Sequence, residues 1–401
     1  MRFSEIAGET GIFVDGDWIE KKDQDAKGAV RLIQLADVGP GEFRDKSDRH
    51  ITVEKADELH CTFLRKGDIL IARLGDPLCK ACVFPLDGLY ITAVDVAILR
   101  IGSDVVNPKY LIYLLNSPWF KDQVKQYESG TTRKRISRKN LDRIEMIFPP
   151  LPEQERIVAR IEELFSQLDA GVETLKKTKA QLAVYRQAVL KEAFDSIEDQ
   201  YYQTLNTAIL GSPQNGLYKP KSNYSDNGTP ILRIDGFYDG FIVKDYYYKR
   251  VNLTVDEITR YSLEIGDLIV NRVNSMPYLG KCALVRFLGE TTVFESNMMR
   301  IKLDNEKVNG DFLTYYLSSS TGRKELTKSA KQAVNQASIN QTDVGNAIVP
   351  MPPVEIQKRL LTYIESRLSV CDSIEQTVDA ALQQAEAMRQ SILKQAFKGE
   401  L

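Results

Sequence analysis

The sequence has little of the side-chain material on which acid–base and metal chemistry usually depends. Its 401 residues include two histidines, His50 and His60, and five cysteines. Because the cysteines are few, odd in number and scattered, they favour a reducing compartment over a disulfide framework. No apolar run reaches the ~18 residues that a membrane span needs, and the N-terminus lacks the pattern of a signal peptide. We therefore expect a cytoplasmic protein without a membrane span.

An excess of positive charge is also missing. Lys and Arg number 53 against 55 Asp and Glu, a formal charge of −2. This excludes a generally polycationic protein that coats nucleic acid, so any contact with DNA must come from local clusters. The 43% hydrophobic and 27% charged residues are typical of a globular protein, and the length predicts two or three domains.

Motifs for catalysis and cofactor binding are absent or incomplete. No Gly-x-x-x-x-Gly-Lys phosphate loop occurs, so ATP-driven translocation is not encoded. Asn107-Pro108-Lys109-Tyr110 lacks the second proline of the Asn-Pro-Pro-Tyr motif of amino-methyltransferases, and no glycine loop for S-adenosylmethionine precedes it. Cys79 and Cys82 have the spacing of a zinc knuckle, but buried reduced thiols account for them better. We predict no catalytic, cofactor-binding or metal site; an enzyme with a cryptic active site is a rival interpretation.

The chain repeats itself, which is the most informative property of the sequence. Residues 149–194 align without a gap on residues 352–397, at an offset of 203. Among the identical pairs are Gln154/Gln357, Asp169/Asp372 and Arg186/Arg389. Upstream of each copy, Gly67-Asp68-Ile69-Leu70 corresponds to Gly266-Asp267-Leu268-Ile269 at an offset of 199. The repeated unit is therefore one variable globular block followed by one long helix.

Both copies of the helix carry apolar residues at a seven-residue spacing. In the first copy the series is Ile161, Leu168, Leu175, Leu182 and Val189, and in the second Ile364, Cys371, Val378, Ala385 and Ile392. Each copy has a companion series four residues earlier, so the pattern predicts a coiled-coil seam. Prolines at 149, 150 and 152, and again at 352 and 353, predict the helix starts. A helix of about 40 residues is too long for one block to cover, so we expect the two copies to pair antiparallel.

The fold class that follows is α+β: two mixed α/β blocks separated by two long antiparallel coiled-coil helices, with a pseudo-twofold internal repeat. The predicted boundaries are 1–148 for the first block, 149–196 for the first helix, 197–350 for the second block and 351–401 for the second helix. Each block is predicted from short strands such as residues 69–72 and 96–99, and from a helix that Asn107 caps. A molecule with two dissimilar blocks at the ends of one rod suits spaced DNA half-sites.

The densest positive segment closes the first block, where residues 128–143 carry a local charge of +4. The corresponding segment of the second block is rich in amides, the side chains that pair bidentately with adenine, whereas arginine pairs with guanine. Two arginines follow the shared Gly-Asp strand at matched positions, and two lysines form a further basic group. A solvated or structural role remains the alternative for each residue. The predicted DNA-binding residues are Arg73, Thr131, Thr132, Arg133, Lys134, Arg135, Arg138, Lys139, Lys219, Lys221, Arg272, Asn274, Asn335, Gln336 and Ser338.

Together, these motifs resemble the specificity subunits of Type I restriction–modification systems over essentially the whole chain. The resemblance is carried by Pro-Pro-Leu-Pro-Glu-Gln at 149–154, its looser copy at 352–357, the Gly-Asp-Ile-Leu strand at 67–70, Ser-Gly-Thr-Thr at 129–132 and the terminal residues 393–401. In the second copy Ile356 replaces Glu153, and Ala333-Val334 replaces Gly130-Thr131.

The resemblance implies a non-catalytic subunit in which the two blocks are target-recognition domains. Each would read one half of an asymmetric bipartite target in double-stranded DNA. It implies two methyltransferase subunits and restriction subunits as partners, with S-adenosylmethionine and ATP bound only by those partners. The alternative from another class is a structural adaptor whose coiled coil pairs protein partners without DNA.

Overall fold

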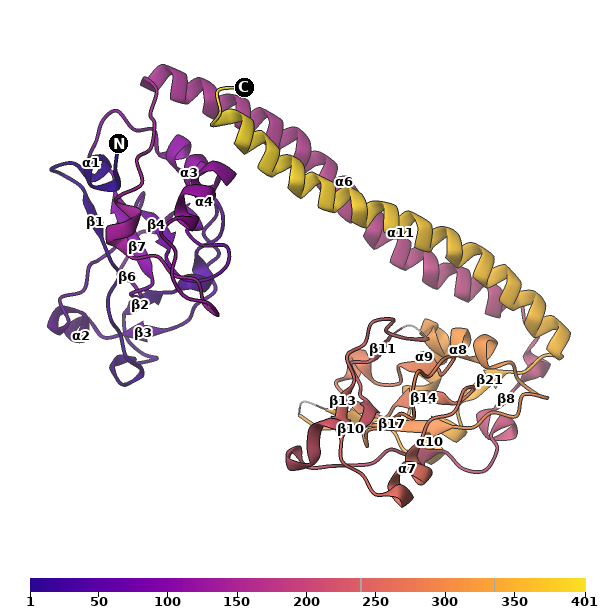
Figure 1. Cartoon of the computed structure of the whole chain (residues 1–401). Coiled ribbons are helices and arrows are strands. Elements are labelled where there is room, and N and C mark those ends of the chain that lie inside the picture. The colour runs from indigo at the N-terminus through magenta and orange to yellow at the C-terminus, as the bar shows by residue number, and fades with distance from the viewer. Residues whose placement is uncertain (239, 335) are drawn as a thin grey trace. The chain divides into compact units, whose positions relative to one another are not determined.

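The computed structural model describes residues 1–238, 240–334 and 336–401. This part of the chain forms two compact units, Met1–Leu175 with Ala380–Leu401 (unit 1) and Lys176–Asp379 (unit 2). Each unit holds one globular block and a part of each long helix. The long helices are α6 (Leu151–Asp195) and α11 (Val354–Ala396), labelled in Figure 1. None of the described helices is long and apolar enough to cross a membrane.

The block of unit 1 is built on two small sheets. The antiparallel sheet β1-β7-β4-β5 joins Ile12–Val14, Val96–Arg100, Ile69–Ala72 and Ala81–Val83. The sheet β3-β2-β6 joins His50–Ile51, Val30–Ile33 and Tyr90–Thr92, and β2 pairs with β6 in parallel. The helices of the block are α1 (Phe3–Ala7), α2 (Val53–Glu58), α3 (Pro108–Asn116), α4 (Pro118–Lys125) and α5 (Arg138–Leu141).

The block of unit 2 has the same topology. Its antiparallel sheet β9-β18-β14-β16 joins Gln214–Asn215, Met298–Ile301, Leu268–Asn271 and Cys282–Leu284. Its second sheet β13-β10-β17 joins Lys249–Val251, Tyr224–Leu232 and Val293–Phe294, and β10 pairs with β17 in parallel. The further strands are β8 (Tyr202–Thr204), β11 (Phe237–Tyr238), β12 (Phe241–Ile242), β15 (Val273–Asn274), β19 (Lys331–Gln332), β20 (Ala337–Ser338) and β21 (Ile348–Pro350). The helices are α7 (Val255–Tyr261), α8 (Gly310–Ser318), α9 (Ser320–Thr327) and α10 (Gln341–Gly345). The predicted duplication of a mixed α/β block is thus confirmed.

The shared Gly-Asp sequence is a structural turn in both units. Gly67 and Gly266 have φ of +95° and +93°, a conformation that favours glycine. Asp68 is buried, binds the backbone N–H of Arg65 at 2.8 Å and forms an ion pair with Arg100 at 2.7 Å. Asp267 in unit 2 is likewise buried and accepts from the N–H of Glu264 at 2.8 Å. The motif therefore fixes the entry to strands β4 and β14.

The long helices run antiparallel within each unit. In unit 1, Arg389 of α11 forms an ion pair with Asp169 of α6. In unit 2, Arg186 of α6 forms an ion pair with Asp372 of α11 at 2.6 Å. These two pairs are the same pair in the two copies of the repeat, which explains why both residues recur at an offset of 203. Antiparallel pairing of the copies is therefore confirmed within each unit.

Only one apolar series is well buried along the paired helices. Ile161, Val189, Ile364 and Cys371 are each at most 2% exposed. The companion series is different, because Tyr185 is 44% exposed and other companion positions also face solvent. The helix ends instead pack into the blocks: Ile157, Ile161, Leu393 and Ala396 join the core of unit 1, and Val189, Phe194, Ile364 and Leu368 join that of unit 2.

A buried glutamine fastens each helix to its block. Gln154 accepts a hydrogen bond from the N–H of Asn107 (2.9 Å) and donates to the carbonyls of Val105 (2.8 Å) and Pro149 (2.7 Å). Gln357 makes the same three bonds, to Asn309, Lys307 and Pro352, at 2.8 to 2.9 Å. Both glutamines are 0% exposed. Since Asn107 and Asn309 cap α3 and α8, each glutamine joins the start of a long helix to the start of a block helix. Figure 1 shows α3 and α8 within their blocks.

Candidate nucleic-acid interface

The basic segment of unit 1 forms a short hairpin, residues 129–135, which we call the basic hairpin. Ser129 and Arg135 exchange two backbone hydrogen bonds of 2.8 Å. Gly130 has a φ of +91°, and a Cβ there would collide with the carbonyl of Arg133, so the turn requires glycine. The other edge of the hairpin pairs with Leu74, just after strand β4. Thr131, Thr132 and Arg133 are exposed at its tip.

The predicted cations of this segment differ in how they are held. Arg133 and Lys139 are exposed and have no side-chain hydrogen bond or ion pair with the residues that the structure describes. Lys134 pairs with Glu128 at 3.2 Å, and Arg135 pairs with Asp95 at 2.8 Å. Such exposed pairs contribute little to stability, so a phosphate can replace the carboxylate. Arg133 and Lys139 are the cations most available to a nucleic acid.

Arg138 has a structural role as well. Its guanidinium donates to the carbonyl of Phe13 at 3.0 Å, lies 5.7 Å from the centre of that ring and reaches Asp15 at 3.3 Å. These contacts bind α5 to strand β1. Its side chain is 43% exposed, so one side of the group still faces solvent.

The two matched arginines that follow the shared strands point inward, which corrects our prediction for Arg73. Arg73 is 5% exposed, and its guanidinium binds the carbonyls of Val94 and Ile136 (3.3 Å) and pairs with Asp15 at 2.9 Å. A guanidinium enclosed in this way cannot reach DNA. Arg272 is half-buried and binds the carbonyl of Ser296 at 3.0 Å, the position equivalent to Val94. We therefore assign both arginines to holding the backbone beside the hairpin.

Unit 2 has an equivalent hairpin, which we call the amide hairpin, formed by β19 and β20. Strand β20 also pairs with β15, so that Val273 faces Ser338 and Asn274 faces Ala337. Gln336 is exposed, whereas Ser338 and Asn274 are half-buried. The predicted residue Asn335 lies outside the described residues. Lys331, an exposed cation of β19, was missed by the sequence analysis, because it stands apart from the amide-rich run.

The remaining predicted lysines lie elsewhere in unit 2. Lys219 is largely buried and forms an ion pair of 2.6 Å with Glu257 of α7. Lys221 is exposed at the start of a short 3₁₀ turn, Lys221–Asn223. Lys219 therefore serves to bind α7, and Lys221 is the more accessible of the two.

Cys79 and Cys82, the pair with zinc-knuckle spacing, lie in the interior as small apolar residues. Cys79 and Cys82 are 0% exposed, and burial raises the pKa of each thiol to about 12. In the part of the chain that the structure describes, no three or more His, Cys, Asp or Glu side chains gather in a way that could hold a metal ion.

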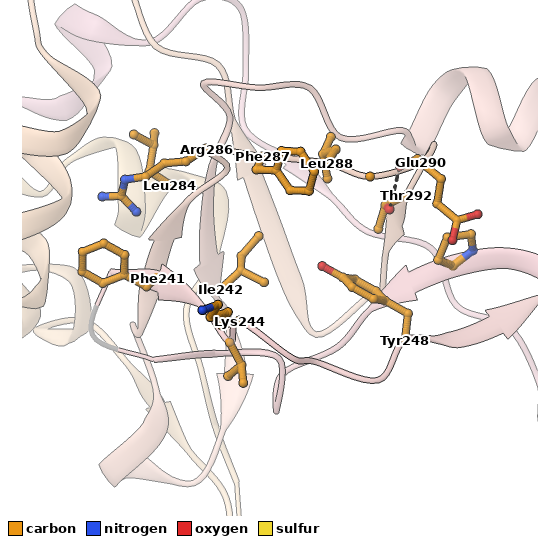
Figure 2. A pocket seen from close by; sticks show the side chains of 13 residues that line it. Phe241, Ile242, Lys244, Tyr248, Leu284, Arg286, Phe287, Leu288, Glu290 and Thr292 are labelled. Atoms are coloured by element: carbon orange, nitrogen blue, oxygen red, sulfur yellow. Dashed lines mark hydrogen bonds between the residues drawn. The ribbon is translucent and has the colours of Figure 1, made fainter. Parts of the chain in front are cut away.

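A pocket of about 590 Å³ lies in unit 2 beside β12. Figure 2 shows Phe241 and Ile242 facing Phe287 and Leu288 across it. Its arginine, Arg286, is paired with Asp311 at 2.6 Å and stacks on Phe241 at 4.2 Å. The lining is mainly apolar, and Lys244 and Glu290 are its other charged residues.

Comparison with known proteins agrees with this duplicated architecture. The family model described as "Type I restriction modification DNA specificity domain" matches residues 11–183 and 209–384. The type I restriction enzyme StySPI specificity subunit of Salmonella potsdam is 28% identical over 307 residues, covering 74% of this chain and 66% of that protein. The EcoKI specificity subunit of Escherichia coli K12 is 27% identical over 305 residues, covering 73% and 65%. The chain thus spans just under two thirds of the length of these two relatives.

A solved structure concerned with complex assembly and conformational transition of the type I R-M system contains a chain of similar fold. It superposes with a TM-score of 0.68 at 18% identity, covering 100% of this chain and 97% of that one. At this identity the likeness concerns the fold.

Proposed function

The chain belongs to the family of Type I restriction–modification DNA specificity proteins, and from this premise we propose that it is the non-catalytic subunit that reads the DNA target. Each block reads one half-site of an asymmetric, bipartite sequence in double-stranded DNA. The subunit recruits two methyltransferase subunits and restriction subunits in the cytoplasm. S-adenosylmethionine and ATP bind to those partners and not to this chain.

The observation that carries the proposal is a hairpin that occurs at the same place in both units but bears different side chains. The basic hairpin and the amide hairpin occupy equivalent places beside strands β4 and β14. The first presents Arg133, with the exposed Lys139 following in helix α5, and the second presents Gln336 and Lys331. Because arginine pairs with guanine and glutamine with adenine in the major groove, the two elements suit two unlike base sequences. If the two hairpins only stabilised their blocks, their exposed side chains would not need to differ.

The long helices support the recruitment of partners. In unit 2, Val184 is 71% exposed, Val370 is 57% exposed and Ile374 is 40% exposed. Apolar side chains of this kind on a paired helix offer a surface for further helices. The partner subunits would cover them when the complex forms.

The test is selection of binding sites from a randomised duplex pool by the full chain, alone and with its methyltransferase subunits. We expect two short motifs at a fixed spacing, and an affinity that falls steeply with salt as phosphates displace counterions. Arg133→Ala and Arg135→Ala should weaken the contacts to one motif and leave the other intact. Arg65→Ala is the matched control, because Arg65 is exposed at the other end of strand β4.

A protein adaptor would give a different result. It would bind the pool without sequence preference and without a steep salt dependence, and it would still assemble with its protein partners. Sequencing the methylated sites in cells that carry the operon gives an independent reading of the same target. Identical motifs for the unmodified chain and both arginine variants would remove the basic hairpin from the interface.

A further inference from the structure

The loop that links each shared strand to the next is held on both sides in both units. In unit 1 it comprises residues 73–80, between β4 and β5, and in unit 2 residues 272–281, between β14 and β16. We call these the clamped loops. They are nearly equal in length and contain Leu78 and Leu279 at equivalent buried positions. Between these fixed points the two sequences differ.

On one side, a basic side chain holds the loop, and it comes from helix α4 in unit 1 and from the equivalent helix α9 in unit 2. Lys121 of α4 donates to the carbonyls of Leu78 (2.8 Å) and Cys79 (2.5 Å). Arg323 of α9 donates to the carbonyls of Leu279 (3.1 Å) and Pro277. Burial of a lysine is costly unless it is fully hydrogen-bonded, and here it lowers the pKa of Lys121 to about 8. A cation retained at the same place in both units indicates that the loop conformation matters.

On the other side, the loops join the hairpins. Gly75 donates its N–H to the carbonyl of Lys134 at 3.0 Å, and Asn274 pairs with Ala337 in the strand ladder. Arg73 and Arg272 are the first residues of the two loops, and their guanidinium groups hold the start of each loop by binding backbone carbonyls of the block. Each clamped loop therefore forms one continuous surface with the hairpin of its own unit.

The tips of the loops are exposed and chemically unlike. Unit 1 presents the carboxylate of Asp76, which has no side-chain partner among the residues that the structure describes. Unit 2 presents Met276, 41% exposed, and Tyr278, 48% exposed. The ammonium of Lys281 lies 4.3 Å from the centre of the Tyr278 ring, which orients that ring. A carboxylate within a basic surface repels the phosphates of DNA, so it favours binding only where it accepts a hydrogen bond from the DNA.

We propose that each clamped loop is a second base-contacting element beside its hairpin. Asp76 accepts a hydrogen bond from the amino group of a cytosine in the half-site of unit 1. Met276, supported by Tyr278, contacts the methyl group of a thymine in the half-site of unit 2. These are the base-edge groups that match a carboxylate and an apolar side chain in the major groove. The inference rests on the proposed function and adds the residues that set its specificity.

The experiment is the same selection with full-length Asp76→Ala and Met276→Ala. Each variant should lose about tenfold of its preference at one position of one half-site, a cytosine for the first and a thymine for the second. The other half-site should be unchanged. Asp104→Ala in unit 1 is the matched control for Asp76→Ala, and Tyr247→Ala in unit 2 is the control for Met276→Ala. Both residues are exposed and lie outside the clamped loops.

A change in the DNA tests the methyl contact directly. Replacing the identified thymine by uracil removes only the methyl group, and it should weaken binding of the unmodified chain as much as Met276→Ala does. The variant itself should then be insensitive to the replacement. Unaltered motifs in both variants, with a clear bipartite motif for the unmodified chain, would overturn the loop assignment alone. An unmodified chain that selects no motif would overturn the proposed function and this inference with it.

Discussion

Substitution of the buried glutamines tests how the long helices are attached. Gln154→Leu keeps the volume of the side chain but removes the bond from Asn107 and the two bonds to the carbonyls of Val105 and Pro149. One N–H and two carbonyl groups then lie beside an apolar side chain in a site with 0% exposure. A buried polar group left without its partner costs about 1 to 3 kcal/mol. Because the two carbonyls can relax, we expect a total loss of about 3 kcal/mol in the free energy of unfolding.

The measurement is urea denaturation followed by circular dichroism. With a urea dependence of about 2 to 3 kcal/mol per M, the loss lowers the midpoint of unit 1 by about 1 M. Gln357→Leu should have an equal effect on unit 2, since it makes the same three bonds. Gln167→Leu, an exposed glutamine of the same helix, is the control and should change stability by less than about 0.5 kcal/mol. A shift for Gln154→Leu no larger than that of the control would refute the reasoning.

Three further predictions concern stability. Arg389→Glu should lower it by about 0.5 to 1 kcal/mol, and adding Asp169→Arg should restore it, as a double-mutant cycle by urea denaturation will report. Burial raises the pKa of Asp17 to about 6, so the folded state binds the proton of this carboxyl more tightly than the unfolded state does. The free energy of unfolding therefore falls as the pH rises from about 4 to 6. Asp17→Asn should be more stable than the unmodified chain at pH 8 and not at pH 4. Phe194→Ala should lower the free energy of unfolding by about 3 to 5 kcal/mol, because its ring is 3% exposed and packs on two aromatic rings. Thermal melting should show a smaller loss of stability for Phe397→Ala, whose side chain is only partly buried.

The repeat made much of the fold predictable. Identical residues at a fixed offset indicated which positions matter, and the structure gives the reasons. Gln154 and Gln357 make the same three bonds, and Asp169 and Asp372 each pair with the arginine of the other helix. The cap at Asn107 was also readable, since an asparagine before a proline is a strong local signal for a helix start.

The candidate interface was predictable only in part. Charge located the basic hairpin, but it did not separate Arg133, which is exposed, from Arg73, which is buried. Which way an arginine points depends on the carbonyl groups that distant strands bring near it, and sequence does not report these. The two side chains that hold the clamped loops, Lys121 and Arg323, were not predicted for a similar reason. They are not identical, and each contacts a loop about 43 or 44 residues away in the sequence.

The helix seam shows a different limit. The heptad spacing predicted two buried series, but Tyr185 of the companion series is 44% exposed. A seven-residue period indicates that a helix has an apolar face, and it does not indicate how many neighbours are present to cover that face. Of the exposed positions that we assign to the partner subunits, Ile374 belongs to this companion series, whereas Val184 and Val370 lie outside both series.

The glutamine attachment also suggests a route to engineered variants. Each glutamine engages only main-chain atoms, so these hydrogen bonds do not depend on which side chains the block carries. The apolar helix-end residues, such as Ile157 and Ile161, still need a matching core in the block. A foreign block that supplies one N–H and one C=O group at the start of its counterpart of α3, together with a matching apolar core, would accept the same glutamine. Chimaeras cut at this joint should inherit the preferences of the transplanted portion while retaining the native scaffold.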